Sequence, residues 1–131
     1  MKINKNIIIY VVAIGVGVFF FLFLSTCTLI GTHVKQKCEI AQAKYEGDCV
    51  EALSTLVDDE KNDYETRNSA IWALGQLGDE RGLVVLNKYY TGDIPDREPL
   101  DEGISQYELK KAIKLDEGGF NATAFVWRSE L

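Results

Sequence analysis

The sequence predicts an all-α protein in which a single N-terminal transmembrane helix precedes a small domain of about two helix pairs. Three observations support this prediction. Residues 7–30 contain no charged side chain, apolar residues recur at helical spacing between residues 64 and 92, and capping-box pairs precede several expected helices. We therefore divide the chain into a tail and anchor, residues 1–31, and a helical domain, residues 32–131.

The uncharged segment is long enough to cross a bilayer as a helix. Its 24 residues exceed the roughly 20 that are needed to span ~30 Å of hydrocarbon. A cleaved signal peptide is the alternative, but its apolar core is typically about 7 to 15 residues long, and no small-x-small cleavage site follows here. Residues 24–27, Leu-Ser-Thr-Cys, resemble a lipoprotein box with Thr in place of the usual small residue, so lipidation of Cys27 stays open.

Charge is concentrated after the anchor, and it is mainly negative. The rest of the chain carries 12 basic residues against 20 acidic ones, a net charge of −8. This excludes nucleic acid as an expected partner, because phosphate binding needs clustered cations. Lys2 and Lys5 before the anchor balance Lys35 and Lys37 after it, so the positive-inside rule does not fix the orientation. The short N-terminal tail favours a signal anchor, with the domain outside the cytoplasm.

The anchor is expected to continue as a helix to about residue 46. One apolar stripe on this part of the helix is formed by Val34, Cys38, Ala41 and Tyr45. Two further helix starts are marked by capping-box spacing, Asp48 with Glu51 and Asn62 with Glu65. The helix that begins after Asp48 is expected to stop near residue 59.

Residues 64–92 form the centre of the predicted domain, a helix, a Leu-Gly-Asp turn and a second helix. The first helix has an apolar stripe of Ala70, Ala73, Leu74 and Leu77. Gly78 follows it where a left-handed cap is usual, and Asp79 is expected to cap the start of the second helix. The stripe of that second helix comprises Leu83, Leu86 and Tyr89 or Tyr90.

The last part of the chain contains an acidic loop, one more helix and an aromatic tail. Residues 93–103 hold five acids and both prolines, and we interpret them as a solvated loop rather than a calcium site, since they lack the alternating ligands of a calcium loop. Ser105 and Glu108 then cap a helix that runs to about residue 116. The tail is too aromatic to be left in water, so we expect it to dock and cover one end of the domain.

Residues 66–86, TRNSAIWALGQLGDERGLVVL, resemble the HEAT-like repeats of the phycobilisome-lyase type. The resemblance extends over about residues 49–92, with a degenerate second copy after it, and it implies a short α-solenoid. In this family the Arg of the repeat pairs with acids of the preceding helix and turn, which implies an ion pair of Arg67 with Asp58 or Asp59. The resemblance also gives Gly78 and Asp79 structural roles.

The sequence lacks the residues for a catalytic or metal site. His33 is the one histidine, so a two-His metal site or a Ser-His-Asp arrangement cannot be assembled. We therefore predict no enzyme activity, no metal and no cofactor. Cys38 and Cys49, eleven residues apart, are disulfide candidates in an oxidising compartment, and the alternative is a pair of buried thiols in a reducing one.

The expected function is that of a membrane-anchored HEAT-like adaptor or scaffold that binds another protein of the same membrane. The bilayer itself is contacted by residues 7–30. The candidate partner-binding residues are aromatic: Trp72, Tyr89, Tyr90, Phe125 and Trp127. Trp72 lies off the main stripe, and packing against a neighbouring repeat is its favoured role. The alternatives are a lyase-like or cofactor-handling accessory protein, and a structural subunit that assembles into a membrane complex through its span.

Overall fold

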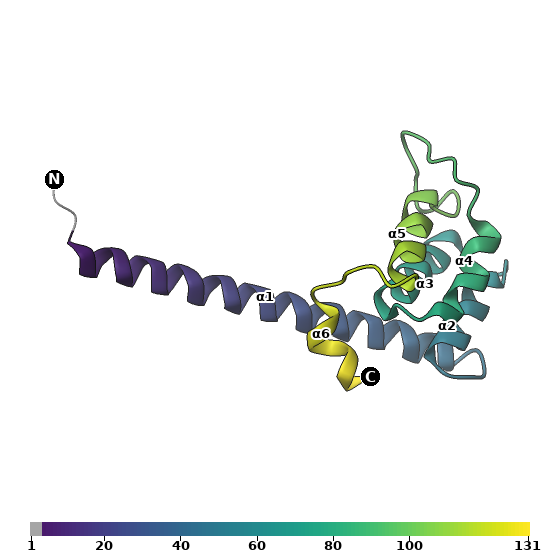
Figure 1. Cartoon of the computed structure of the whole chain (residues 1–131). Helices are drawn as coiled ribbons and strands as arrows, with labels where there is room; N and C mark the ends of the chain where they lie inside the picture. Colours follow the sequence, from purple (N-terminus) through teal and green to yellow (C-terminus); the bar gives the residue numbers. More distant parts are fainter. Residues whose placement is uncertain (1–3) are drawn as a thin grey trace.

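A computed structural model describes residues 4–131, and these residues form six α-helices and two short 3₁₀ turns (Figure 1). The all-α prediction is therefore confirmed. In chain order the elements are α1 (Lys5–Gln42), α2 (Cys49–Asp58), α3 (Tyr64–Leu77), η1 (Glu80–Gly82), α4 (Leu83–Tyr89), α5 (Gln106–Asp116), α6 (Ala124–Trp127) and η2 (Arg128–Glu130).

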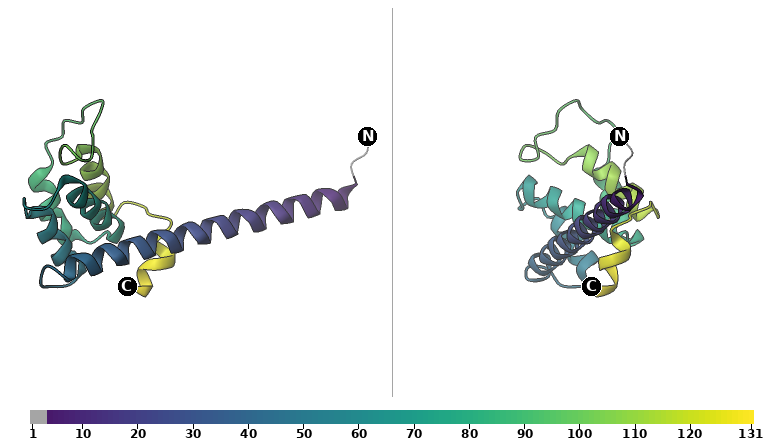
Figure 2. Two further views of the ribbon diagram at one scale, coloured as in Figure 1. Left: turned by 180° about the vertical axis from the view of Figure 1, so that it is seen from behind. Right: turned by 90° about the vertical axis from the view of Figure 1, so that its left-hand side faces the viewer.

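Helix α1 is one uninterrupted helix of 38 residues with two different surroundings. Its first part projects from the domain without tertiary cover and is long and apolar enough to cross a membrane (Figures 1 and 2). Cys27 is the first fully buried side chain, and Val34, Cys38 and Ala41 lie in or beside the core of the domain. The apolar arm and the first helix of the domain are therefore one continuous element.

α1 ends earlier than the sequence predicted. The expected end was near residue 46, but the helix stops at Gln42, and the backbone N–H of Ala43 donates to the carbonyl of Glu39. A turn leads from there to Asp48, which begins α2. The difference of four residues is within the ordinary uncertainty of a helix end read from sequence. The chain reverses within the eleven residues that separate Cys38 from Cys49, which the disulfide joins.

Helix α3 lies at the centre of the domain. α2 packs on one side of it and α5 on the other, while α4 packs mainly on α5 (Figure 1). All six α-helices contribute buried apolar side chains to one core, with Leu53, Ile71, Leu74, Leu86 and Leu109 among the largest. No repeat is identified within residues 4–131, and the arrangement in two stacked pairs stays a prediction.

A close approach of α3 and α5 explains the small residues of the central segment. A Cβ atom on Gly75 would lie 2.6 Å from the Cα atom of Ala112, so the backbones of α3 and α5 are in direct contact there. A side chain at position 75 would push the two helices apart. The Ala-Leu-Gly run of the sequence thus serves the packing of α3 on α5.

Most of the predicted caps are present. Asp48 and Glu51 form a complete capping box, and the Ser105 hydroxyl accepts the backbone N–H of Glu108 at 3.1 Å. Gly78 closes α3 in the left-handed conformation, with φ 63°. Asp79 is also a cap, but of the 3₁₀ turn η1, where its side chain accepts the backbone N–H of Arg81.

The predicted pairing of Asn62 with Glu65 at the start of α3 is wrong. The cap is the next residue, Asp63, whose carboxylate accepts the backbone N–H of Thr66 at 2.8 Å. Asn62 instead donates to the carbonyl of Leu56 at 2.9 Å and so satisfies the end of the preceding helix. An acid is preferred at the cap because it also complements the helix dipole.

Candidate functional site

The predicted disulfide is present and joins the end of α1 to the start of α2. Cys38 and Cys49 are linked with their Cα atoms 5.0 Å apart. The bond closes the turn between the two helices and fixes the direction in which the domain leaves the long helix. The remaining cysteine, Cys27, is a buried free thiol on α1.

Arg67 is a buried structural residue, as the resemblance implied, but its partners differ. Its Nε donates to the carbonyl of Val57 at 2.8 Å, and its guanidinium lies 5.1 Å from the ring centre of Tyr89. The salt bridges of residues 4–131 do not include Arg67, so the expected ion pair with Asp58 or Asp59 is wrong. The carbonyl of Val57, near the C-terminal end of α2, needs a donor from outside the helix, and the guanidinium of Arg67 supplies it. A positive charge is also favoured at this end of the helix dipole.

Asp58 and Asp59, which were expected to pair with Arg67, form their contacts with other residues. Asp58 forms a salt bridge with Lys88 and accepts the hydroxyl of Tyr89 at 2.9 Å. The hydrogen bond from Lys88 is the main cause of the lowered pKa of Asp58. Asp59 accepts the backbone N–H of Lys61 at 3.0 Å and a side-chain hydroxyl from the turn after α1. Both acids are therefore structural, through contacts that join α2 to α4 and to the turns on either side of α2.

Two polar side chains that the sequence analysis missed hold the acidic loop. Asn68, buried in α3, donates to the carbonyls of Leu100 and Gly103 at 2.9 and 2.8 Å and accepts the backbone N–H of Ser105 at 2.9 Å. Glu98 accepts the Ser105 hydroxyl at 2.8 Å and caps the first backbone N–H groups of α5. The carboxylate of Glu98 is thus committed to the start of α5.

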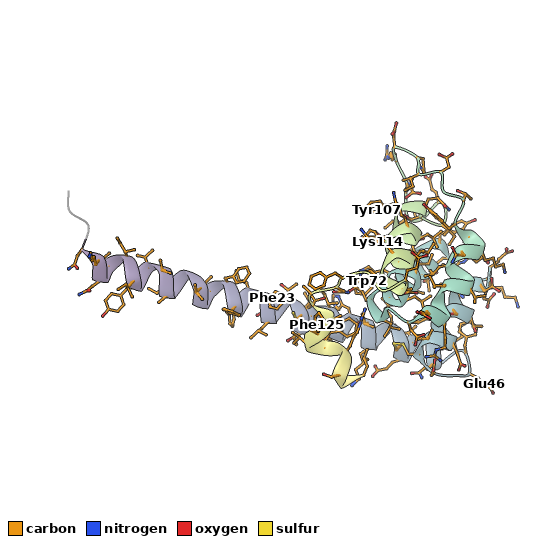
Figure 3. The ribbon with its side chains drawn as sticks, viewed as in Figure 1. Phe23, Glu46, Trp72, Tyr107, Lys114 and Phe125 are labelled. Carbon is orange, nitrogen blue, oxygen red and sulfur yellow. A yellow bond between two sulfur atoms is a disulfide. The ribbon has the colours of Figure 1, made fainter. Side chains whose placement is uncertain are left out.

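Of the five aromatic candidates for partner binding, Phe125 is the one that the structure presents to solvent. Its side chain is 80% exposed. Tyr89 and Tyr90 are half-buried, and Trp72 is half-buried against the core (Figure 3). Trp127 is only 4% exposed and is therefore covered within the chain, and its role as a partner contact stays a prediction. Its ring is covered because it packs on α1.

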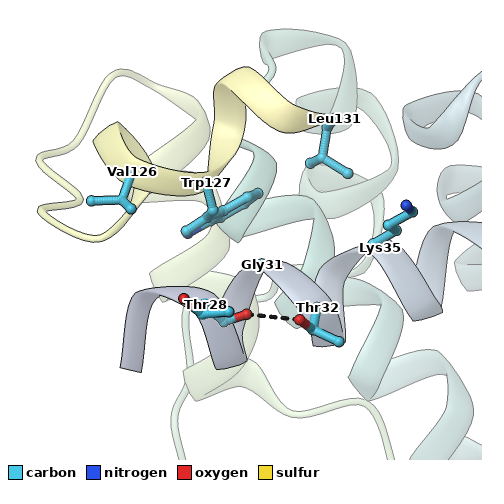
Figure 4. Close-up of a pocket in the computed structure, with 7 residues that line it drawn as sticks. All are labelled: Thr28, Gly31, Thr32, Lys35, Val126, Trp127 and Leu131. Atoms are coloured by element: carbon cyan, nitrogen blue, oxygen red, sulfur yellow. Dashed lines mark hydrogen bonds between the residues drawn. The ribbon is translucent and has the colours of Figure 1, made fainter. Parts of the chain in front are cut away.

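The C-terminal segment docks on α1 at the end of the exposed arm. A Cβ atom on Gly31 would lie 2.7 Å from the Cβ of Trp127, so α6 meets α1 where α1 has no side chain. A shallow hollow of about 260 Å³ remains beside this contact (Figure 4). It is lined by Thr28, Gly31, Thr32, Lys35, Val126, Trp127 and Leu131. The docking of the aromatic tail is thus confirmed for Trp127, which is its anchor. Phe120 and Phe125 were also expected to cover this end of the domain, but they are exposed to solvent.

Polar contacts tie the same segment to the end of α3. The guanidinium of Arg128 donates from Nε and Nη2 to the carbonyl of Gln76 at 2.9 and 2.7 Å. The amide of Asn121 donates to the Gln76 side chain at 2.9 Å. The contact is close because Gly78, beside Gln76, leaves room for the guanidinium. No pattern in the sequence pointed to this contact, since an Arg near a chain end is usually solvated.

Asp116 is a buried acid at the end of α5. Its side chain is 1% exposed, and neither carboxylate oxygen has a hydrogen-bond partner among the described residues. Burial, with a smaller contribution from the negative charge of Asp79, raises its pKa to about 7, and the nearby charge of Arg128 opposes this shift. With this pKa, the charge of Asp116 changes near neutral pH.

The described residues do not offer a metal centre. Within residues 4–131 no group of three or more His, Cys, Asp and Glu side chains is placed to hold an ion. What the structure brings together instead is a junction, at which the exposed arm, the domain and the C-terminal segment meet. Comparisons of the chain with protein families, with curated proteins and with solved structures found no match.

Proposed function

We propose that this chain is a single-pass membrane adaptor whose helical domain binds another protein of the same membrane. The observation that carries the proposal is the continuity of α1, which runs from the uncovered apolar arm into the domain core without a break. A flexible tether would allow the domain to turn freely. A continuous helix instead gives the domain a fixed height and a fixed direction above the bilayer, which suits a protein that presents one face to a neighbour.

The domain is proposed to lie outside the cytoplasm. The Cys38–Cys49 disulfide supports this orientation, because such bonds form and persist in oxidising compartments. A count of free thiols in natively purified protein tests the orientation: one thiol, that of Cys27, is expected, and three would place the domain in a reducing compartment.

We also propose that residues 49–92 are a HEAT-like unit. Support comes from the packing of α2 on α3, from the left-handed Gly78 at the end of α3, and from the buried Arg67 that reaches back to α2. A single unit leaves its outer faces uncovered, and α1 and the C-terminal segment cover part of them here. A helical face of this kind is a surface for protein binding and needs no catalytic group.

The partner is proposed to contact α4. This helix lies on the side of the domain away from the exposed arm (Figure 1). Its Val84 is 81% exposed, the most exposed large apolar side chain of α2 to α5. Tyr90, the C-cap of α4, is half-buried against the core.

Crosslinking with mass spectrometry in native membranes tests the adaptor proposal. One dominant protein neighbour is expected, with crosslinks to the domain. Val84→Arg is expected to remove these crosslinks, whereas Leu100→Arg, the same kind of change in the acidic loop, is expected to keep them. Equal loss in both variants, or no loss in either, would contradict α4 as the binding surface.

Replacement of residues 7–30 by an unrelated apolar span separates the adaptor from the other functions. An adaptor keeps its neighbour after this exchange, because the neighbour contacts the domain. A structural subunit that assembles through its span loses it. A lyase-like or cofactor-handling protein is expected to give no stable neighbour and to copurify with a bound chromophore, which visible absorption detects.

A further inference from the structure

Two exposed aromatic rings stand side by side on the C-terminal segment. Phe120 and Phe125 are 82% and 80% exposed, and their ring centres lie 6.2 Å apart. They line a mainly apolar hollow of about 480 Å³ together with Gly118, Gly119, Asn121, Ala124, Arg128 and Ser129. Single exposed apolar side chains are ordinary, but a pair that is held in place on a docked segment forms a patch.

The patch lies at the level of the end of the apolar arm. α6 packs on α1 around Gly31, and Cys27 is the first residue of α1 that is fully buried (Figures 1 and 2). At ~1.5 Å per residue the uncharged residues 7–30 extend over roughly 36 Å, against ~30 Å of hydrocarbon. The last turn of this segment therefore reaches the headgroup boundary, and α6 lies beside that turn.

A row of lysines lies on the same side of the domain. The exposed face of α5 carries Tyr107, Lys110, Lys111 and Lys114. α5 forms the side of the domain from which the exposed arm of α1 emerges, and Figure 3 shows Tyr107 and Lys114 along this side (Figures 2 and 3). Lys111 is paired with Glu108 at 3.1 Å on the same helix. The salt bridges among the described residues do not include Lys110 and Lys114, and anionic headgroups attract such cations.

We infer that residues 118–131 dock on the surface of the bilayer that α1 crosses. Phe120 and Phe125 enter the headgroup region, and the lysines of α5 face anionic lipid phosphates. The inference rests on the proposed function in one respect, since it needs α1 to span the bilayer. An arm that is longer than the hydrocarbon core tilts, and interfacial anchors decide the direction of the tilt. The docked segment would thus hold the domain at a fixed orientation.

Site-directed fluorescence on the full-length chain tests this inference. A nitrobenzoxadiazole label is placed on one cysteine at a time, Val16→Cys in the arm, Phe125→Cys in the patch or Val84→Cys on α4, each with Cys27→Ala. The proteins are reconstituted in vesicles of phosphatidylcholine and phosphatidylglycerol. Lipids with a nitroxide near the headgroup or deep in the acyl chain then quench the label according to its depth.

The expected result is a graded one. The label at position 16 is quenched by the deep nitroxide, the label at position 125 by the shallow nitroxide, and the label at position 84 by neither. A label at position 125 that is no better quenched than that at position 84, while position 16 is quenched, overturns the inference and leaves the span intact. Absence of quenching at position 16 overturns the proposed membrane span itself.

Two further measurements identify the occupant of the patch. Phe120→Asp is expected to reduce the quenching at position 125, and Leu100→Asp, on the distant acidic loop, is expected to leave it unchanged. Equal quenching in Phe120→Asp contradicts a role of the aromatic pair. If the label at position 125 is protected from aqueous iodide in native membranes but not in pure lipid vesicles, a protein covers the patch and the lipid inference is wrong.

Discussion

The two parts of α1 have the same backbone and opposite surroundings. From Lys5 to Thr26 the helix has almost no tertiary cover, and from Cys27 to Gln42 one face is buried in the domain. Both parts are helical because the backbone hydrogen bonds of a helix are satisfied within it, wherever it lies. Helix formation and tertiary cover are thus separate properties here, because the domain supplies its own core and the apolar arm is helical without one.

The same substitution should therefore have different effects in the two parts. Leu53→Ala, at a fully buried site of α2, is expected to lower the free energy of unfolding of the domain by about 2–5 kcal/mol. Leu22→Ala, in the arm where the side chain is 58% exposed, is expected to leave it unchanged. Guanidinium unfolding of the full chain in detergent micelles, followed by the fluorescence of Trp72 and Trp127, measures both. Equal losses would show that the arm packs on the domain.

Dependence on pH separates the two parts as well. Asp116 has a pKa of about 7 in the folded protein and an ordinary value of 3.8. Between about pH 4 and pH 7 the unfolded chain therefore releases a proton that the folded protein keeps. The free energy of unfolding should fall as pH rises through this window, by at most about 1.4 kcal/mol per pH unit. Residues 7–30 carry no acidic or basic side chain, so their membrane insertion should stay constant.

Unfolding curves between pH 4 and pH 8 test this prediction, with Asp116→Asn as the control that should remove the slope. The pKa shifts of Asp58 and Asp79 do not contribute to the slope between pH 4 and pH 8. The hydrogen bond from Lys88 is the main cause of the lowered pKa of Asp58. The hydrogen bond from Arg81 is the main cause of the lowered pKa of Asp79. Their contributions are present above the ordinary pKa of 3.8 and are lost only as pH falls below it. An unchanged slope in the variant would exclude Asp116 as its source.

The disulfide links the buried part of α1 to α2 and does not involve the exposed arm. Cys38→Ala together with Cys49→Ala is expected to lower the free energy of unfolding of the domain by about 2–3 kcal/mol, because a closed loop of this size no longer restricts the unfolded chain. Cys27→Ala, which breaks no bond, is the matched control. Reduction of the native protein should give the same loss as the double variant, and a protein that is indifferent to reduction would contradict it.

The local elements were predictable from the sequence because their signals are local. The uncharged run, the Asp48–Glu51 capping box and the Gly78 cap each depend on residues close together in the chain, and all three appear as expected. The pairing of Cys38 with Cys49 was also predictable, since both flank one turn.

Long-range polar contacts were not predictable in the same way. Arg67 was assigned a carboxylate partner and has a backbone carbonyl, and Arg128 reaches Gln76 across 52 positions of sequence. The exposure of Phe125 and the burial of Trp127, two residues apart on one short helix, depend on where α6 meets α1. A single sequence does not contain that information, because it arises only after the chain has folded.

Substitution of single glycines is expected to have the smallest effect, and it compares the arm and the domain with the same change of residue. Gly75→Ala is expected to lower the free energy of unfolding by about 1–3 kcal/mol, since the new Cβ would meet the backbone of Ala112 and separate α3 from α5. Gly17→Ala has no atom within 4 Å to meet, so it should not lower the stability, and its better helix propensity favours the arm. Gly31→Ala lies between these cases, because its Cβ would contact Trp127. If Gly31→Ala shifts the Trp127 emission without lowering the free energy of unfolding, α6 can detach from α1 while the rest of the domain stays folded. A loss as large as that of Gly75→Ala would instead show that the C-terminal segment unfolds together with the core.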